Sequence, residues 1–152
     1  MAENRPPVHP PAFITHPPKR VLFLCVHNSA RSQIAEGFAH HFAPAGVEIW
    51  SAGIEPRDVH PLAIEVMKEA GIDITTQTSK LLDSVPWRDA DTVITLCGEA
   101  DEACPTVADE VRRRHWWLPD PAASPEATRL AAFRELRDEI RWRVASLWPG
   151  GE

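Results

Sequence analysis

Short apolar runs alternate with helical patterns along most of this chain. The runs, which are typical of strands buried on both faces, are RVLFLC at 20–25, VEIWSAG at 47–53 and DTVITLC at 91–97. The helical patterns, with apolar residues on one face, span 32–42, 61–70 and 125–148. This alternation predicts an α/β fold with an open, mostly parallel four-stranded sheet and helices on both faces. Such sheets bind ligands at the carboxyl ends of their strands, where Cys25 and Cys97 both stand.

The first eighteen residues differ in composition from the rest. They hold six of the fifteen prolines and no periodic apolar pattern, which is typical of an extended or disordered segment. We therefore expect residues 1–18 to be a proline-rich leader and residues 19–152 to form a single domain. A dispensable tail is favoured over a partner-binding motif, because proline pairs alone are a weak ligand signal.

Charge and hydropathy narrow the class of protein. The net charge of -6 argues against general nucleic-acid binding, which depends on clustered Lys and Arg. No apolar run approaches the roughly 20 residues that span a bilayer, and the N-terminus lacks the zones of a signal peptide. We expect a cytoplasmic monomer that binds no membrane. The three cysteines, an odd number without a secretory signal, favour reduced thiols with chemical roles over a disulfide framework.

The loop CVHNSAR joins the first strand to the first helix. Five residues separate Cys25 from Arg31, and a loop of this length can turn its backbone N–H groups inward at the positive end of a helix. We expect the loop to bind a tetrahedral oxyanion, with Arg31 donating two hydrogen bonds to it. We expect Cys25 to act as a nucleophile, because the N–H groups and the positive end of the helix favour its thiolate. The expected oxyanion-binding residues are Val26, His27, Asn28, Ser29, Ala30, Arg31 and Ser32. The alternative is a core cysteine followed by a solvated arginine.

The string CVHNSARSQIAEG resembles the signature loop of the low-molecular-weight protein tyrosine phosphatase superfamily, and more closely that of its thioredoxin-coupled arsenate reductase branch. Seven residues match that branch in place, with Ile34 where it has methionine: Asn28, Arg31, Ser32, Gln33, Ala35, Glu36 and Gly37. The similarity continues through SAG at 51–53, TSK at 78–80, TLCGEADEACP at 95–105 and HWWLPDPA at 115–122. It covers about residues 20–148, nearly everything after the leader. The fold that it implies is the phosphatase-like α/β sheet.

The resemblance also implies a reaction. Arsenate binds in the loop, Cys25 attacks arsenic, and Asp120 protonates the departing oxygen as general acid. Cys97 then attacks Cys25 and Cys104 attacks Cys97, so that arsenite leaves and a disulfide passes outward. Thioredoxin would reduce the final Cys97–Cys104 pair, and no cofactor is implied. From the residues alone, Cys97 and Cys104 also suit inert packing or, less well, a zinc site, and Asp120 between prolines also suits a plain turn.

The chain departs from the phosphatases after the Asp-Pro motif. Those enzymes usually carry tyrosines there, whereas this chain has no tyrosine and continues with Ala122 and Ala123. This weakens the alternative of a low-molecular-weight protein phosphatase acting on phosphotyrosine or phosphoarginine. A non-enzymatic oxyanion sensor is disfavoured, because Cys25, Arg31 and Asp120 are all retained.

A second departure concerns metal binding. Some relatives hold a potassium ion with an asparagine, a glutamate, a serine and an aspartate. Asn28, Glu36 and Ser51 match the first three, but Lys80 stands at the fourth position. We expect the Lys80 ammonium to pair with Glu36 and to take the place of the ion, so that no metal is required.

Overall fold

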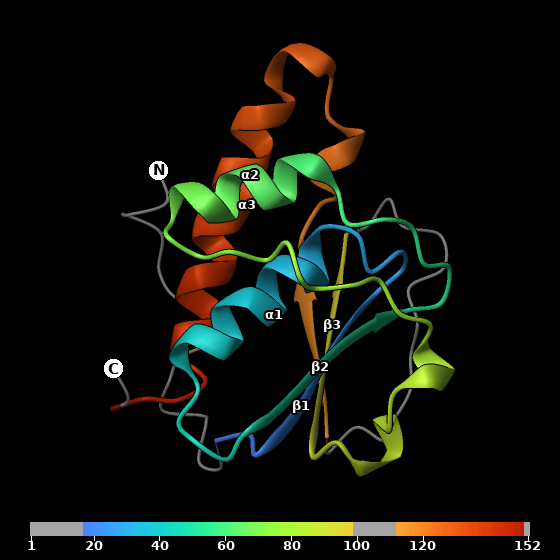
Figure 1. Ribbon diagram of the computed structural model, residues 1–152, viewed down its shortest axis with the longest axis vertical. Coiled ribbons are helices and arrows are strands. Elements are labelled where there is room, and N and C mark those ends of the chain that lie inside the picture. The colour runs from blue at the N-terminus through green and yellow to red at the C-terminus, as the bar shows by residue number, and fades with distance from the viewer. Residues whose placement is uncertain (1–16, 99–111, 151–152) are drawn as a thin grey trace.

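The computed structural model describes residues 17–98 and 112–150. Its centre is an all-parallel, four-stranded sheet in the order β2-β1-β3-β4 (Figure 1). The strands are β1 Arg20–Cys25, β2 Glu48–Gly53, β3 Thr92–Cys97 and β4 Arg113–Trp117. The predicted fold class is confirmed, and the first three strands match their predicted bounds within one residue. The sequence did not delimit β4, because three of its five residues are Arg or His and only Trp116 is fully buried.

Helices cover both faces of the sheet. Among the described residues, three α-helices pack on one face: α1 Arg31–Phe42, α2 Pro61–Glu69 and α3 Glu126–Ala145 (Figure 1). Two one-turn 3₁₀ helices, η3 Leu82–Ser84 and η4 Trp87–Asp89, cover the other face, and η5 Pro121–Ala123 follows β4. No helix in these ranges is long and apolar enough to cross a bilayer.

The predicted helix at 125–148 ends earlier than its apolar pattern suggests. After Ala145 the chain turns, and the indole N–H of Trp148 donates to the carbonyl of Pro18 at 2.8 Å. Trp148 therefore continues the apolar stripe as a core residue without being helical. Most of the predicted leader, residues 1–16, lies outside the described residues, so the domain boundary stays a prediction.

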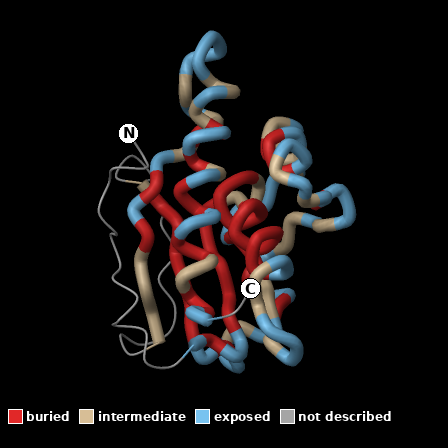
Figure 2. Tube along the Cα trace, turned by 90° about the vertical axis from the view of Figure 1, so that its left-hand side faces the viewer, coloured by how far each residue is buried: buried red, intermediate tan, exposed pale blue. Residues whose placement is uncertain are grey.

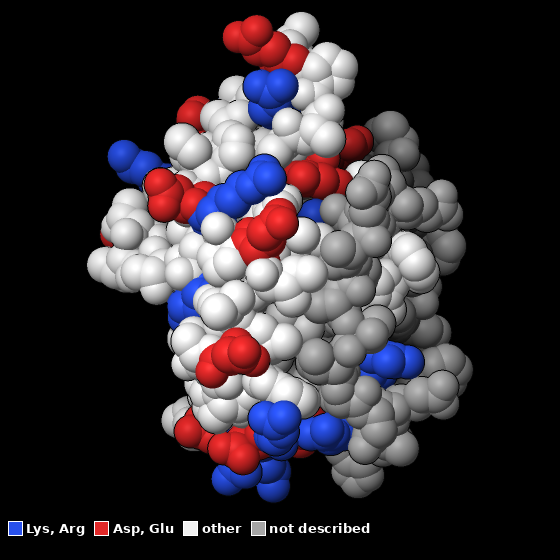
Figure 3. Space-filling view, turned by 90° about the vertical axis from the view of Figure 1, so that its right-hand side faces the viewer, with Lys and Arg blue, Asp and Glu red and all other residues white. Residues whose placement is uncertain are grey.

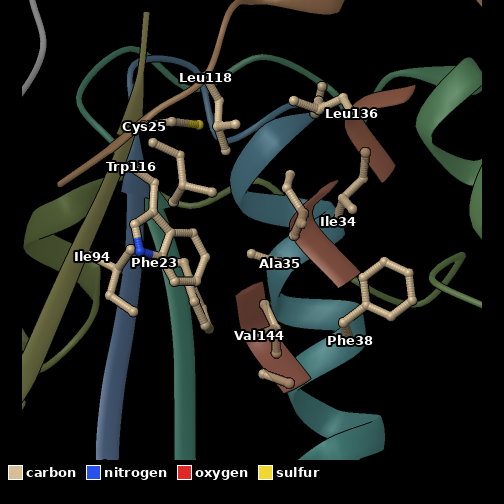
Figure 4. Packing of buried hydrophobic residues seen from close by; sticks show 14 of the residues in the cluster. Phe23, Cys25, Ile34, Ala35, Phe38, Ile94, Trp116, Leu118, Leu136 and Val144 are labelled. Carbon is tan, nitrogen blue, oxygen red and sulfur yellow. The ribbon is translucent and has the colours of Figure 1, made fainter. Parts of the chain in front are cut away.

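Apolar side chains pack on both faces of the sheet. Figure 2 marks by colour the parts of the chain that are buried. On the side of the α-helices, Phe23, Phe38 and Phe133 are fully buried, and burying a side chain of this size stabilises the fold by roughly 2–3 kcal/mol. Leu22 and Leu24 point the other way and pack with the residues of η3 and η4. Because successive strand residues face opposite sides, Cys25 shares the face of Phe23 and lies in the core that Figure 4 shows.

Charged side chains are mixed on the surface. In the view of Figure 3, Lys and Arg are interspersed with Asp and Glu over the described residues, without a continuous basic patch that would suit a phosphate backbone. Arg134 and Arg137 of α3 both bind Glu69 of α2, at 2.7 and 2.8 Å. These pairs fix how the two helices lie against each other.

Two glycines allow neighbouring backbone segments to approach each other closely at the carboxyl ends of the strands. Cys25 of β1 is paired with Gly53 of β2. A side chain at Gly53 would place its Cβ 2.7 Å from the carbonyl oxygen of Val26, closer than any real contact. At the end of β3, a Cβ on Gly98 would lie 3.0 Å from the carbonyl oxygen of Leu118. Both glycines let backbone segments reach the end of β1, where the sheet reverses its order of connection.

Candidate active site

The loop between β1 and α1 borders a hollow of about 510 Å³ at the carboxyl end of the sheet. Cys25, Arg31 and Asp120 all line it. They come from three places in the chain: the end of β1, the start of α1 and the segment that follows β4. Of the other residues predicted to bind an oxyanion, three line the hollow and three are buried behind it. These are His27, Ser29 and Ala30 in the lining, and Val26, Asn28 and Ser32 behind.

Hydrogen bonds to the segment 54–60 orient the loop backbone. The carbonyl of Val26 accepts from the N–H groups of Ile54 and Glu55 at 3.0 and 2.9 Å, and the carbonyls of His27 and Ser29 accept from Arg57 and His60, each at 3.0 Å. The carbonyl of Asn28 accepts from the side chains of Gln33 and Ser79, at 3.0 and 2.6 Å. In a trans peptide the N–H points opposite to the preceding carbonyl, so the N–H groups of residues 27–30 point away from these partners. A row of N–H groups turned inward in this way is a nest for an anion.

Asn28 holds the loop in a conformation that few residues adopt. Its φ is +48°, in the left-handed region that asparagine tolerates better than most side chains. The side chain is fully buried and satisfied: Oδ1 accepts from the N–H of Lys80 at 2.8 Å, while Nδ2 donates to the hydroxyls of Ser32 and Ser51 at 2.7 and 3.0 Å. These three bonds fix which way the amide faces.

The direction of these hydrogen bonds determines what Ser32 offers to Cys25. Ser51 accepts from Asn28 and donates its own proton to the carboxylate of Glu36 at 2.5 Å. Ser32 also accepts from Asn28, and its hydroxyl proton is available to the sulfur of Cys25, 2.9 Å away.

Glu36 ends this chain of hydrogen bonds as a buried anion. Burial alone would raise its pKa, but hydrogen bonds from His40 and Ser51, with the charges of Lys80 and His40, outweigh burial and hold the pKa below its ordinary value. The Lys80 ammonium lies 3.7 Å from Glu36 Oε1, so the expected pair is present. An ammonium at this distance offsets the charge of the carboxylate, and the replacement of a potassium ion by Lys80 stays a prediction.

Arg31 connects the loop to the segment that carries Asp120. Arg31 is 3% exposed, and its Nη1 donates to the carbonyl of Leu118 at 3.0 Å. Asp120 lies two residues further on, where its Oδ1 accepts from the N–H of Ala122 at 3.0 Å and caps η5. The capped oxygen acts as an acceptor, so a proton on this carboxyl belongs on Oδ2. Asp120 therefore combines the predicted turn role with a place beside Cys25.

His60 is a residue of this hollow that the sequence did not predict. It precedes α2, its backbone N–H donates to the carbonyl of Ser29 at 3.0 Å, and it lines the hollow with Asp120. The only signal in the sequence is its place before Pro61, at the start of a helical pattern, which predicts a cap and no chemistry.

Cys97 stands at the end of β3, the strand next to β1, and is fully buried. Ile94 and Leu96 share the face of Cys25, so strand alternation places the Cys97 side chain on the opposite face. Cys97 is disulfide-bonded whereas Cys25 is free, so the bond does not join these two. Cys104, the third predicted redox residue, lies outside the described residues. Within those residues, no group of three or more His, Cys, Asp and Glu side chains is placed to hold a metal.

Comparisons with known proteins agree with this geometry. The model of the family described as low molecular weight phosphotyrosine protein phosphatase matches residues 20–149. The arsenate reductase of Bacillus subtilis (strain 168) is 45% identical over 128 residues, which are 83% of this chain and 92% of that protein.

Solved structures give the same picture. An arsenate reductase in its oxidized state superposes with a TM-score of 0.72 at 39% identity, over 85% of this chain and 95% of the other. A thioredoxin-dependent arsenate reductase of Corynebacterium glutamicum superposes with a TM-score of 0.66 at 32% identity, over 90% of this chain and 63% of the other. The fold of this chain therefore occurs in structures described as arsenate reductases.

Proposed function

The chain belongs to the low molecular weight phosphotyrosine protein phosphatase family and, within it, to the arsenate reductases, and we propose that it reduces arsenate to arsenite through a relay of three thiols. One observation carries the proposal. Free, buried Cys25 lies beside an anion nest, while Cys97 on the neighbouring strand is disulfide-bonded. Phosphate transfer needs only the first of these features, whereas a two-electron reduction needs a second thiol.

The first step is binding of the oxyanion. In this proposal the inward N–H groups of residues 27–30 and the guanidinium of Arg31 hold three oxygens of arsenate, and the fourth faces Asp120. Backbone donors and a planar guanidinium suit a tetrahedral anion, because their positions are set before the ligand arrives. The arsenic atom then lies in front of the sulfur of Cys25.

The second step joins sulfur to arsenic. The Cys25 thiolate gives an electron pair to As(V), and a sulfur–arsenic bond forms as an arsenic–oxygen bond breaks. The leaving hydroxyl takes the proton that Asp120 carries on Oδ2 and departs as water. The hydroxyl of Ser32 lies 2.9 Å from this sulfur in the free enzyme.

The third step is the reduction itself. The thiolate of Cys97 attacks the sulfur of Cys25, and the electron pair of the sulfur–arsenic bond goes to arsenic, which leaves as As(III) in arsenite. Cys104 then attacks Cys97, which frees Cys25 and leaves a Cys97–Cys104 disulfide. The bonded Cys97 and free Cys25 of the structure support this end state. In this bonded form the Cys97 side chain faces the other side of the sheet, so the attack requires that it lie on the face of Cys25 in the reduced form.

Thioredoxin is the proposed electron donor. The relay ends in a disulfide that needs two electrons from outside the chain, and thioredoxin supplies them by dithiol exchange. The thioredoxin-dependent enzyme of C. glutamicum supports this assignment. We place the reaction in the cytoplasm, where such dithiol donors keep thiols reduced.

The proposal is tested by a single turnover with arsenate. We expect the reduced wild type to lose two thiols and to end with a Cys97–Cys104 disulfide, located by peptide mapping. Cys104→Ser should stop at a Cys25–Cys97 disulfide, and Cys97→Ser should form no disulfide and release no arsenite.

The same variants decide between reductase and phosphatase. If arsenate consumes no thiols, and Cys97→Ser hydrolyses an aryl phosphate as fast as a phosphatase does, the reductase proposal is wrong. Among the described residues, the lining of the hollow contains no Phe, Trp or Tyr against which an aryl group could stack. We therefore expect hydrolysis of aryl phosphates to be slow.

A further inference from the structure

His60 shares the hollow of the active site with Cys25, Arg31 and Asp120, but the steps described above give it no role. Its backbone is fixed to the loop, because its N–H donates to the carbonyl of Ser29 at 3.0 Å. Its ring packs against Phe133 of α3, with 4.8 Å between ring centroids. The residue is therefore held in place at the hollow.

A hydrogen bond to α2 determines which ring nitrogen carries the proton. The N–H of Leu62 points at Nδ1 of His60, 3.1 Å away. A backbone N–H only donates, so Nδ1 accepts and carries no proton. The proton of the neutral ring is then on Nε2, which makes no hydrogen bond to a described residue.

The surroundings of His60 keep the ring neutral. Burial lowers its pKa, and the positive charge of Arg129 lowers it further, against the opposing effect of Asp120. Asp120 lines the same hollow as the ring. His60 thus offers a neutral donor on the side of the hollow where Asp120 stands.

We propose that His60 binds the substrate, donating from Nε2 to the arsenate oxygen that faces away from the loop. This inference rests on the proposed function. The loop N–H groups and Arg31 bind the arsenate oxygens that face the loop, whereas the oxygen that faces away gains a proton and leaves. Asp120 and His60, which line the same hollow, both donate to it. A neutral donor stabilises the charge on this oxygen without competing with Asp120 to deliver the proton.

Two substitutions separate this role from the capping of α2. In His60→Asn, the amide oxygen takes the place of Nδ1 and still caps the helix, but nothing reaches the position of Nε2. In His60→Gln, the longer amide carries an N–H to the position of Nε2, but glutamine is a poor cap. The asparagine variant therefore keeps the cap and loses the donor, and the glutamine variant does the reverse.

The experiment measures kcat/KM for arsenate with thioredoxin, and the concentration of inorganic phosphate that protects Cys25 from iodoacetamide. We expect His60→Asn to keep the wild-type melting temperature and to lose on the order of tenfold in one or both measures. His60→Gln should melt at a lower temperature but stay within about threefold of wild type in both. His41→Gln, an exposed ring outside the hollow, is the matched control.

The inference is overturned if His60→Asn matches wild type in both measures, or if His60→Gln falls as far as His60→Asn. The protection of Cys25 by phosphate needs no redox step, so it tests the role of His60 even if wild type fails to reduce arsenate. In that case the proposed function fails by itself, and the two results remain distinguishable.

Discussion

The hydroxyl of Ser32, in the first turn of α1, lies 2.9 Å from the sulfur of Cys25 at the end of β1. Its proton is directed at the sulfur because Asn28 already donates to the hydroxyl oxygen. A chain of buried hydrogen bonds continues from Asn28 through Ser51 to Glu36. The hydrogen-bonded surroundings of the Cys25 sulfur therefore depend on side chains that are buried behind the hollow and do not line it.

Ser32→Ala removes the donor to the sulfur. A charge-assisted hydrogen bond stabilises a thiolate by about 1.5–3 kcal/mol, so we expect the alkylation rate of Cys25 at neutral pH to fall roughly tenfold. Ser29→Ala is the matched control, because the hydroxyl of Ser29 donates to the carbonyl of Asp58 and not to sulfur. Equal alkylation rates for wild type and Ser32→Ala would contradict the assigned direction of the bond.

Replacing Asn28 separates backbone strain from side-chain hydrogen bonding. Both Asn28→Ala and Asn28→Gly lose the amide that orients Ser32, so both should lose most of the arsenate turnover. Only alanine is strained at a φ of +48°, so Asn28→Ala should unfold more easily than Asn28→Gly, by about 1 kcal/mol. Urea unfolding measures the difference. An alanine variant more stable than the glycine variant would mean that the loop has changed conformation.

Glu36→Gln tests the buried carboxylate through its pH dependence. The folded-state pKa of Glu36 lies below its ordinary value of 4.5, so the stabilisation is full above that value and is lost as pH falls through the folded-state pKa. We expect the variant to be about 2 kcal/mol less stable at neutral pH, since it loses hydrogen bonds to a charged group. The gap should narrow in acid below pH 4.5. A gap that stays constant with pH, as for the exposed control Glu135→Gln, would count against an ionised Glu36.

Lys80→Asp tests whether the Lys80 ammonium replaces a bound cation in neutralising Glu36. The substitution places a second carboxylate near Glu36, so a free cation is needed to offset the repulsion. We expect the variant to be less stable in potassium-free buffer and to regain stability when potassium is added. Wild type should respond to neither change. Thermal melts in choline and potassium salts give the answer, and a wild-type melting temperature that rises with potassium would refute the replacement.

Gly53→Ala tests the close approach of β2 to the loop. The added Cβ would meet the Val26 carbonyl at 2.7 Å and the Asn28 nitrogen at 2.9 Å, both rigid backbone atoms. We expect the loop to be displaced and the protection of Cys25 by phosphate to weaken by tenfold or more. Gly37→Ala is crowded to a similar degree, with Ile74 at 2.8 Å, but lies away from the hollow. It should lose stability and keep its phosphate affinity.

Local sequence predicted the parts of the fold that depend on local contacts. The run at 20–25 and the helical pattern after the loop follow from periodicity, and α1 begins one residue before its predicted start because Ile34 already bonds back to Ala30. The sequence did not predict the edge strand β4, because its Arg and His residues are only half-buried and show no apolar alternation. A strand is recognised by burial, and an edge strand has less of it.

The candidate site was predictable only where one stretch contains it. Cys25 and Arg31 are neighbours in one loop, but the orientation of that loop depends on carbonyl acceptors bonded to residues 54–60. Neither segment contains a sequence pattern that predicts the hydrogen bonds between them, so the sequence did not predict His60 as a residue of the site. Asp120 was selected by resemblance, since a carboxylate between prolines is otherwise a common turn residue.

The opposite orientation of Cys25 and Cys97 also affects how these two cysteines respond to dioxygen and peroxide. Two cysteines form a disulfide only when their Cβ atoms come within about 4.5 Å, and strand alternation turns these two side chains away from each other. In the form that the structure shows, Cys97 is bonded to another residue and faces away from Cys25, so these two sulfurs do not close a disulfide with each other. Under the proposed relay, this is the form that waits for the external reductant, and in it the Cys25 thiol is kept from pairing with Cys97.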